Sequence, residues 1–133
     1  MNLGKKIAAL GLIGILSVGQ SMSALAATTF TVNVPFVKYL SPNYQVTGTV
    51  SASTADYYLS LRQWIVYIPN NSTTESASDV RNSYSSSKIK TYTATHTINI
   101  DSGVAKRAIS RGYSSNTKGV QQNMVGQSVY QMN

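Results

Sequence analysis

The chain of 133 residues contains few side chains that could take part in catalysis. It has no cysteine, which excludes thiol chemistry and cysteine-ligated metal sites. Its one histidine, His96, lies between Ala94 and Ile98 on the apolar side of a predicted strand, where we expect a hydrogen-bonded core histidine. The carboxylates lie at a strand start and in turns and loops, which predicts no catalytic pair or calcium site: Asp56, Glu75, Asp79 and Asp101. We therefore predict a protein that is not an enzyme, with no catalytic residues, no metal site and no cofactor.

Positive charge is concentrated in the C-terminal part of the sequence. The formal net charge is +7, and residues 88–133 contain a single anion, Asp101. A one-sided field of this kind attracts anionic partners over a long range and is weakened by salt. The alternative interpretation is a solvated basic surface that only keeps the protein soluble. The cations of this predicted basic surface are Lys88, Lys90, Lys106, Arg107, Arg111 and Lys118.

A second candidate for binding is an aromatic strip on the predicted strand 56–68. Tyr58, Arg62 and Trp64 alternate along one side of this strand. Aromatic faces with a cation nearby suit sugar rings or stacked bases. Val66 and Ile68 continue the same side, so a place for Trp64 in the core is the other interpretation.

The first 26 residues have the pattern of a secretory signal peptide. Lys5 and Lys6 precede an apolar run over residues 7–19, and Ala24-Leu25-Ala26 supplies the small residues of a cleavage site. As a helix this run would be about 20 Å long, shorter than the roughly 30 Å hydrocarbon core of a bilayer. We therefore predict cleavage after Ala26 and a secreted, extracellular mature chain. Its net charge is +5, and it has no transmembrane span.

The elements that must position these residues are predicted to be strands. Alternation of apolar and polar residues, together with β-branched and aromatic side chains, indicates strands over 28–34, 44–52, 56–68, 89–100 and 119–131. The segment 104–113 is ambiguous. It is either the returning strand of a hairpin, which we favour because Asp101-Ser102-Gly103 suits a three-residue turn, or a short helix closed by Gly112.

These elements predict an all-β protein with a small antiparallel β-sandwich of about six strands. Residues 27–133 have the length of one domain. Residues 70–87 are rich in serine and threonine and poor in apolar groups. We predict that they form a long polar loop that crosses between the sheets.

Three function classes are compatible with this sequence. The first is a secreted, non-enzymatic protein that binds an anionic cell-envelope polymer, an acidic glycan or an anionic lipid surface through the basic C-terminal surface. Nucleic acid is not expected, because the protein is predicted to be secreted. The second is a bacteriocin-like antimicrobial or toxin that acts on the envelope of a target cell. The third is a self-assembling extracellular structural protein, in which the uncharged, amide-rich tail from Val120 to Asn133 pairs with its copies.

Overall fold

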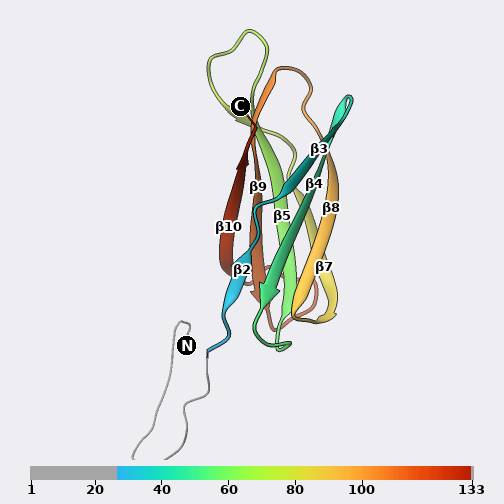
Figure 1. Cartoon of the computed structure of the whole chain (residues 1–133), viewed down its shortest axis with the longest axis vertical. Helices are drawn as coiled ribbons and strands as arrows, with labels where there is room; N and C mark the ends of the chain where they lie inside the picture. Colours follow the sequence, from blue (N-terminus) through green and yellow to red (C-terminus); the bar gives the residue numbers. More distant parts are fainter. Residues whose placement is uncertain (1–26, 133) are drawn as a thin grey trace, which may run out of the picture.

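Residues 27–132, the part that the computed structural model describes, form a β-sandwich of two antiparallel sheets (Figure 1). The prediction of an all-β sandwich is confirmed. The predicted signal peptide, residues 1–26, lies outside the described residues. Residues 27–132 contain no helical segment with the length and hydropathy of a membrane span.

The two sheets of residues 27–132 contain nine strands, compared with the prediction of about six. The four-stranded sheet contains β2 (Phe30–Val32), β3 (Phe36–Leu40), β4 (Asn43–Ala52) and β8 (Thr91–Asn99). The five-stranded sheet contains β5 (Tyr58–Ile68), β6 (Ser76–Ala77), β7 (Arg81–Lys88), β9 (Val104–Ser115) and β10 (Asn123–Gln131).

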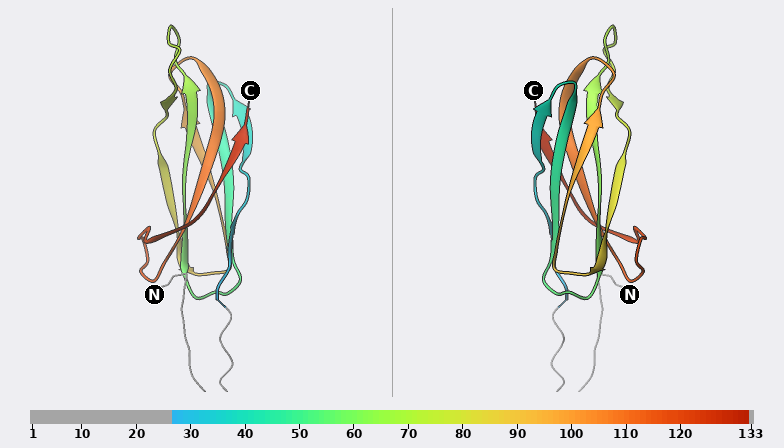
Figure 2. Two further views of the ribbon diagram at one scale, coloured as in Figure 1. Left: turned by 90° about the vertical axis from the view of Figure 1, so that its left-hand side faces the viewer. Right: turned by 90° about the vertical axis from the view of Figure 1, so that its right-hand side faces the viewer.

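Each sheet is organised around one long strand. In the four-stranded sheet, β4 pairs with β8 on one side and with β2 and β3 on the other. In the five-stranded sheet, β5 pairs with β9 on one side and with β6 and β7 on the other, and β10 follows beyond β9. Figure 2 shows the two layers from their edges. The chain therefore exposes one broad outer face on each sheet.

The core between the sheets is divided by a layer of polar side chains. Two clusters of buried apolar residues lie toward opposite ends of the sandwich, one around Val46 and Ile65 and the other around Val50 and Leu61. Gln63 lies between them on β5 and is completely buried. Buried amides are stable only when they are hydrogen-bonded, so partners from other strands must meet Gln63 here.

Three strands contribute to this polar layer. Gln63 Nε2 donates to Ser110 Oγ at 2.8 Å, and Gln63 Oε1 lies 2.5 Å from His96 Nδ1. The opposite strand has Gly48 at this level, and a Cβ there would lie 2.4 Å from Gln63 Nε2. The missing side chain of Gly48 thus provides the space that the amide occupies.

The structure corrects the prediction of a polar loop over residues 70–87. This segment contains β6 and β7, both of which pair with β5. The sequence pattern hid these strands because buried serines take the place of apolar residues. Ser85 Oγ accepts a hydrogen bond from the Leu59 N–H, and Ser78 Oγ accepts one from the Ile65 N–H, each at 2.9 Å.

The segment 104–113 is a strand, within β9, and not a helix. The predicted hairpin with the preceding strand is wrong, because among the described strands β8 pairs with β4, whereas β9 pairs with β5 and β10. The turn at Asp101-Ser102-Gly103 therefore crosses from one sheet to the other. Gly103 has a φ of +118°, and a Cβ there would lie 2.1 Å from Ile68 O. Glycine thus satisfies both the backbone conformation and the close approach of this crossover.

Candidate functional site

The aromatic strip lies on the outer face of the five-stranded sheet. Leu61 and Ile65 on β5 point into the core and are fully buried, so the alternating residues point outward. Tyr58, Arg62 and Trp64 are therefore on the outside, where all three are half-buried. Of the two interpretations of Trp64, the structure supports a position on an outer face rather than between the sheets.

Arg62, Trp64 and Arg111 form the centre of this outer face, together with Gln127 from β10. Arg62 and Arg111 are directly opposite each other on β5 and β9, and Gln127 is opposite Arg111 on β10. The Arg111 guanidinium lies 5.0 Å from the centroid of the Trp64 ring, and its Nε donates to Gln127 Oε1 at 2.8 Å. The indole ring and the amide thus hold Arg111 in a fixed orientation. We call these four residues the central arginine cluster.

The central arginine cluster has an excess of positive charge. Within residues 27–132 one salt bridge is formed, between Arg107 and Glu75, and no carboxylate neutralises Arg62 or Arg111. Like charges directly opposite each other on a sheet are destabilising. Two unneutralised arginines side by side, one of them oriented by an aromatic ring, are therefore suited to a bound anion, because guanidinium groups form charge-assisted, bidentate hydrogen bonds with carboxylates and phosphates.

Cations also occur toward both ends of the same outer face. Lys88 is opposite Tyr58, with its Nζ 5.9 Å from the centroid of the tyrosine ring. Arg107 is opposite Val66, near the other end of β5. The residues of β5 opposite these cations, Tyr58, Arg62 and Val66, are four residues apart. Four residues span about 13 Å at the usual rise of a strand. The cations therefore form a row about 26 Å long, with the central arginine cluster in the middle.

The six residues of the predicted basic surface do not form one patch. Arg111 belongs to the central arginine cluster, and Lys88 and Arg107 lie in the row described above. Lys106 is next to Arg107 on β9, while Lys90 is exposed between β7 and β8 and Lys118 is exposed in the β9–β10 loop. The sequence grouped these residues by their positions along the chain, but the sheet distributes them over the whole length of the sandwich.

Glu75 offsets part of the charge near the end of the row. Its carboxylate accepts two hydrogen bonds from the Arg107 guanidinium, at 2.7 and 2.8 Å. This contact lowers the pKa of Glu75 and raises the pKa of Arg107, and the nearby charge of Lys106 adds to the lowering at Glu75. Arg107 is thus less available to an external anion than Arg62 or Arg111.

Two polar residues of this face were missed by the sequence-based reasoning. Gln127 orients Arg111, as described above. Gln121, in the loop between β9 and β10, donates from Nε2 to Asn82 Oδ1 at 3.2 Å and so connects this loop to β7. Both residues belong to the amide-rich tail that the sequence analysis singled out for self-association, and no local pattern distinguishes a glutamine with either contact.

His96 is separate from this outer face and belongs to the polar layer of the core. Its pKa is lowered, first because burial disfavours the charged ring and second because the charge of Arg81 is close. The hydrogen bond to Gln63 accounts for its presence on an otherwise apolar side of β8.

The lowered pKa of His96 predicts a loss of stability on mild acidification. The unfolded chain binds a proton at His96 as the pH falls through 6.5, the ordinary value, whereas the folded chain resists this until lower pH. The free energy of unfolding should therefore decrease as the pH falls below 6.5, because the folded chain binds this proton less readily than the unfolded chain. Urea denaturation over this range measures it. His96→Gln should remove this dependence of the unfolding free energy on pH, since the chain has one histidine. If the unfolding free energy of that variant still decreased by the same amount, the effect could not be assigned to His96.

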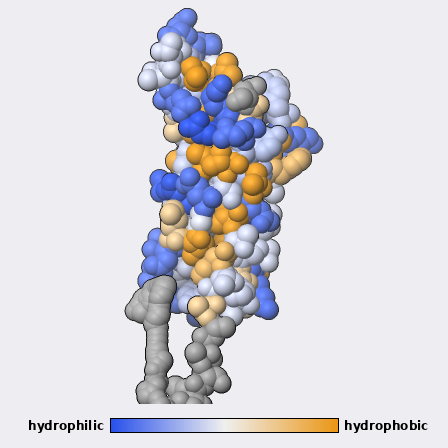
Figure 3. Space-filling model, turned by 60° about the vertical axis from the view of Figure 1, so that its left-hand side comes forward, coloured by the Kyte–Doolittle hydropathy of each residue, from blue (hydrophilic) through white to orange (hydrophobic). Residues whose placement is uncertain are grey.

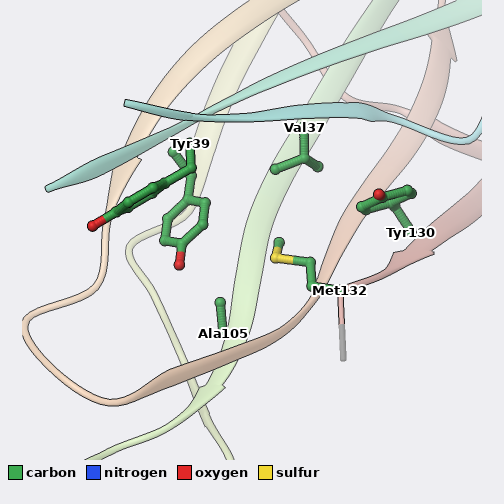
Figure 4. Close-up of a pocket in the computed structure, with 6 residues that line it drawn as sticks. Val37, Tyr39, Ala105, Tyr130 and Met132 are labelled. Carbon is green, nitrogen blue, oxygen red and sulfur yellow. The ribbon is translucent and has the colours of Figure 1, made fainter. Parts of the chain in front are cut away.

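A pocket of about 310 Å³, lined in part by three tyrosines, lies at the side of the sandwich that carries β10. Figure 3 shows a band of hydrophobic residues along this side. Tyr39 from β3 and Tyr130 from β10 lie on opposite sides of the pocket, with Val37 and Met132 between them (Figure 4). No charged residue lines this pocket, so it is chemically distinct from the outer face with the arginines.

No family model matches this chain, and no curated protein matches it. Solved structures with some similarity include β-glucosidase 3B from Thermotoga neapolitana in complex with α-D-glucose, with a TM-score of 0.44, 10% identity and coverage of 82% of this chain and 16% of that chain. Another is DesR, a β-glucosidase from Streptomyces venezuelae, with a TM-score of 0.41, 16% identity and coverage of 82% and 15%. The chain spans less than a fifth of the length of each of these enzymes. The similarity gives no reason to assign glycosidase activity to it.

Proposed function

We propose that this protein is a secreted, non-enzymatic module that binds an extended anionic polymer of a cell envelope or matrix. The binding surface is the outer face of the five-stranded sheet. The observation that carries the proposal is the pair of neighbouring arginines, Arg62 and Arg111, which lack a carboxylate partner within residues 27–132 and of which one is oriented by Trp64.

The spacing of the cations supports an extended polymer as the ligand. Lys88, the central arginine cluster and Arg107 follow one another along β5 at intervals of about 13 Å. A chain that carries a carboxylate, sulfate or phosphate on each repeating unit can reach all three positions at once. A single small anion can occupy only one, so binding several positions raises the affinity for the polymer without new contacts.

Titration with polymers of known charge tests this function. Trp64 is the only tryptophan in the chain and lies under Arg111, so its fluorescence reports directly on the central arginine cluster. We expect saturable binding of polyphosphate and alginate at low salt, weaker binding as NaCl screens the charges, and no binding of neutral dextran. Fragments much shorter than about 26 Å, the length of the row of cations, should bind more weakly than long chains.

Control experiments distinguish binding of an anionic polymer from binding of a lipid surface and from killing of cells. Anionic and zwitterionic vesicles test a lipid surface, and preference for the vesicles over every soluble polymer would contradict the proposal. Equal binding of dextran and alginate, or no binding at low salt, would also contradict it. Loss of viability of exposed cells is the readout that distinguishes the bacteriocin-like alternative, because polymer binding alone does not predict killing.

A further inference from the structure

The four-stranded sheet has an edge that is unusually open to pairing. β8 runs from Thr91 to Asn99 and pairs with β4 over its whole length without a bulge. It contains no lysine, arginine, aspartate, glutamate or proline. An exposed strand of this length and character is a template for another strand.

The other border strands in the described sandwich each carry a feature that hinders pairing. β10 has a bulge, and β2 lies beside it, with Ser128 Oγ donating to Val32 O. β2, β3 and β6 are short, and Pro35 separates β2 from β3. β7 pairs irregularly with β5 and carries Arg81 and Lys88 at its ends. Bulges, short strands and charges are the usual means of protecting an edge, and β8 has none of them.

The backbone of β8 presents its free groups in a self-complementary pattern. At the start of the ladder the Ala52 N–H donates to Lys90 O at 2.7 Å. Because the hydrogen bonds alternate along an antiparallel pair, the even-numbered residues of β8 bond to β4. The N–H and C=O groups of the odd-numbered residues therefore point to the open edge, and within residues 27–132 no strand pairs with them there: Thr91, Thr93, Thr95, Thr97 and Asn99.

We propose that β8 pairs antiparallel with β8 of a second copy of this chain, across a two-fold axis at Thr95. This register places Thr95 opposite Thr95 of the second copy and Thr93 opposite Thr97 of the second copy. The hydrogen-bonded pairs then involve odd-numbered residues on both strands, and each of these pairs exchanges two backbone hydrogen bonds. The interface is isologous, as expected for a dimer of identical chains.

The side chains of β8 suit this register. Threonine hydroxyls already pair across β4 and β8, at 2.8 Å between Thr47 and Thr95 and at 2.9 Å between Thr49 and Thr93. The second copy would extend the same threonine rows across the axis, and cross-strand threonine pairs stabilise sheets. On the inner side, the register places Tyr92 opposite Ile98 of the second copy, which is an aromatic and β-branched pair.

The dimer has a consequence that rests on the proposed function. The two-fold axis is perpendicular to the joined sheet, so the outer faces of both five-stranded sheets lie on the same side of the dimer. Two rows of cations are then available to one long anionic polymer, which increases its apparent affinity.

Substitutions that place a charge at residue 95 test the proposed dimer interface of β8. Sedimentation of the purified protein at increasing concentration should show a monomer–dimer equilibrium. High salt should shift it toward the dimer, because both copies are positively charged. Thr95→Lys and Thr95→Glu should each abolish the dimer by placing like charges on the axis, and an equimolar mixture of the two variants should restore it.

Thr47→Lys is the matched control. It adds the same charge to the same outer face and breaks the same threonine pair, but on β4, one strand away from the edge. It should leave the dimer intact. A wild-type monomer at every concentration and salt would overturn the proposal. A dimer that persists in both Thr95 variants would also overturn it and would point to the tail from Val120 to Asn133 instead. Since salt weakens polymer binding but favours the dimer, failure of either proposal can be recognised separately.

Discussion

Replacing Arg62 and Arg111 together by glutamate is expected to weaken the binding of an anionic polymer at least about 30-fold. Each replacement converts an attraction of about 0.5 kcal/mol at an exposed site into a repulsion of similar size, so two replacements change the binding free energy by about 2 kcal/mol. The loss should be largest at low salt and should shrink as NaCl screens the charges. Titration of alginate, followed by Trp64 fluorescence and by an independent calorimetric measurement, checks it.

The double replacement Lys106→Glu with Arg107→Glu is the control for net charge. It changes the charge of the protein by the same amount, but at a place where Glu75 already engages Arg107. We expect only a few-fold loss of binding. Equal losses for the two pairs would show that the total charge matters and not the central arginine cluster, and an unchanged affinity of the Arg62 and Arg111 variant would remove that cluster from the site.

The long strands could be predicted from the sequence because their alternation is strong. β5 and β8 have uninterrupted patterns, and both were predicted within two or three residues of their observed ends. β7 could not be predicted in this way, since Ser85 is buried but polar and is stabilised by the backbone of another strand. The alternation of apolar and polar residues reveals a buried position only when the buried side chain is apolar.

The composition of the candidate site could be predicted, but not its arrangement. The sequence placed Arg62 and Trp64 on one side of a strand and assigned Arg111 to the basic surface. Their meeting depends on the register of β5 with β9, which brings residues 62 and 111 together. The pairing of β5 with β7 and with β9 places Lys88 and Arg107 toward opposite ends of β5, although the sequence analysis grouped them in one basic surface. Long-range pairing therefore decided which of the predicted cations form a site.

The buried polar layer shows the same limit in the core. Gln63 is one position away from Arg62 in a strand where the sequence analysis emphasised apolar and aromatic residues. Its partners Ser110 and His96 come from two other strands. At Gly48 the strand β4 pairs with β8 without a bulge, and the Gln63 amide occupies the space that a side chain would fill.

Gly48→Ala is accordingly expected to destabilise the protein by about 3 kcal/mol. The added Cβ would lie 2.4 Å from Gln63 Nε2 and 2.6 Å from Ser110 Oγ, so the hydrogen bond between these groups must break or the sheets must separate. Overpacking costs about 1–3 kcal/mol, and a buried amide left without its partner costs about 1–3 kcal/mol more. Against this, alanine gains roughly 0.5–1 kcal/mol over glycine within a strand. The midpoint of thermal unfolding should fall by about 13 °C.

Gly126→Ala separates the effect of the polar layer from that of any added methyl group. Its Cβ would meet only Val32, at 3.0 Å from a side-chain methyl that can move, and it touches no buried polar group. We expect a change well below that of Gly48→Ala, measured by urea denaturation of both variants at pH 7.5. A Gly48→Ala protein as stable as the wild type would mean that Gln63 finds another partner. The polar layer would then not hold the two sheets at a fixed distance.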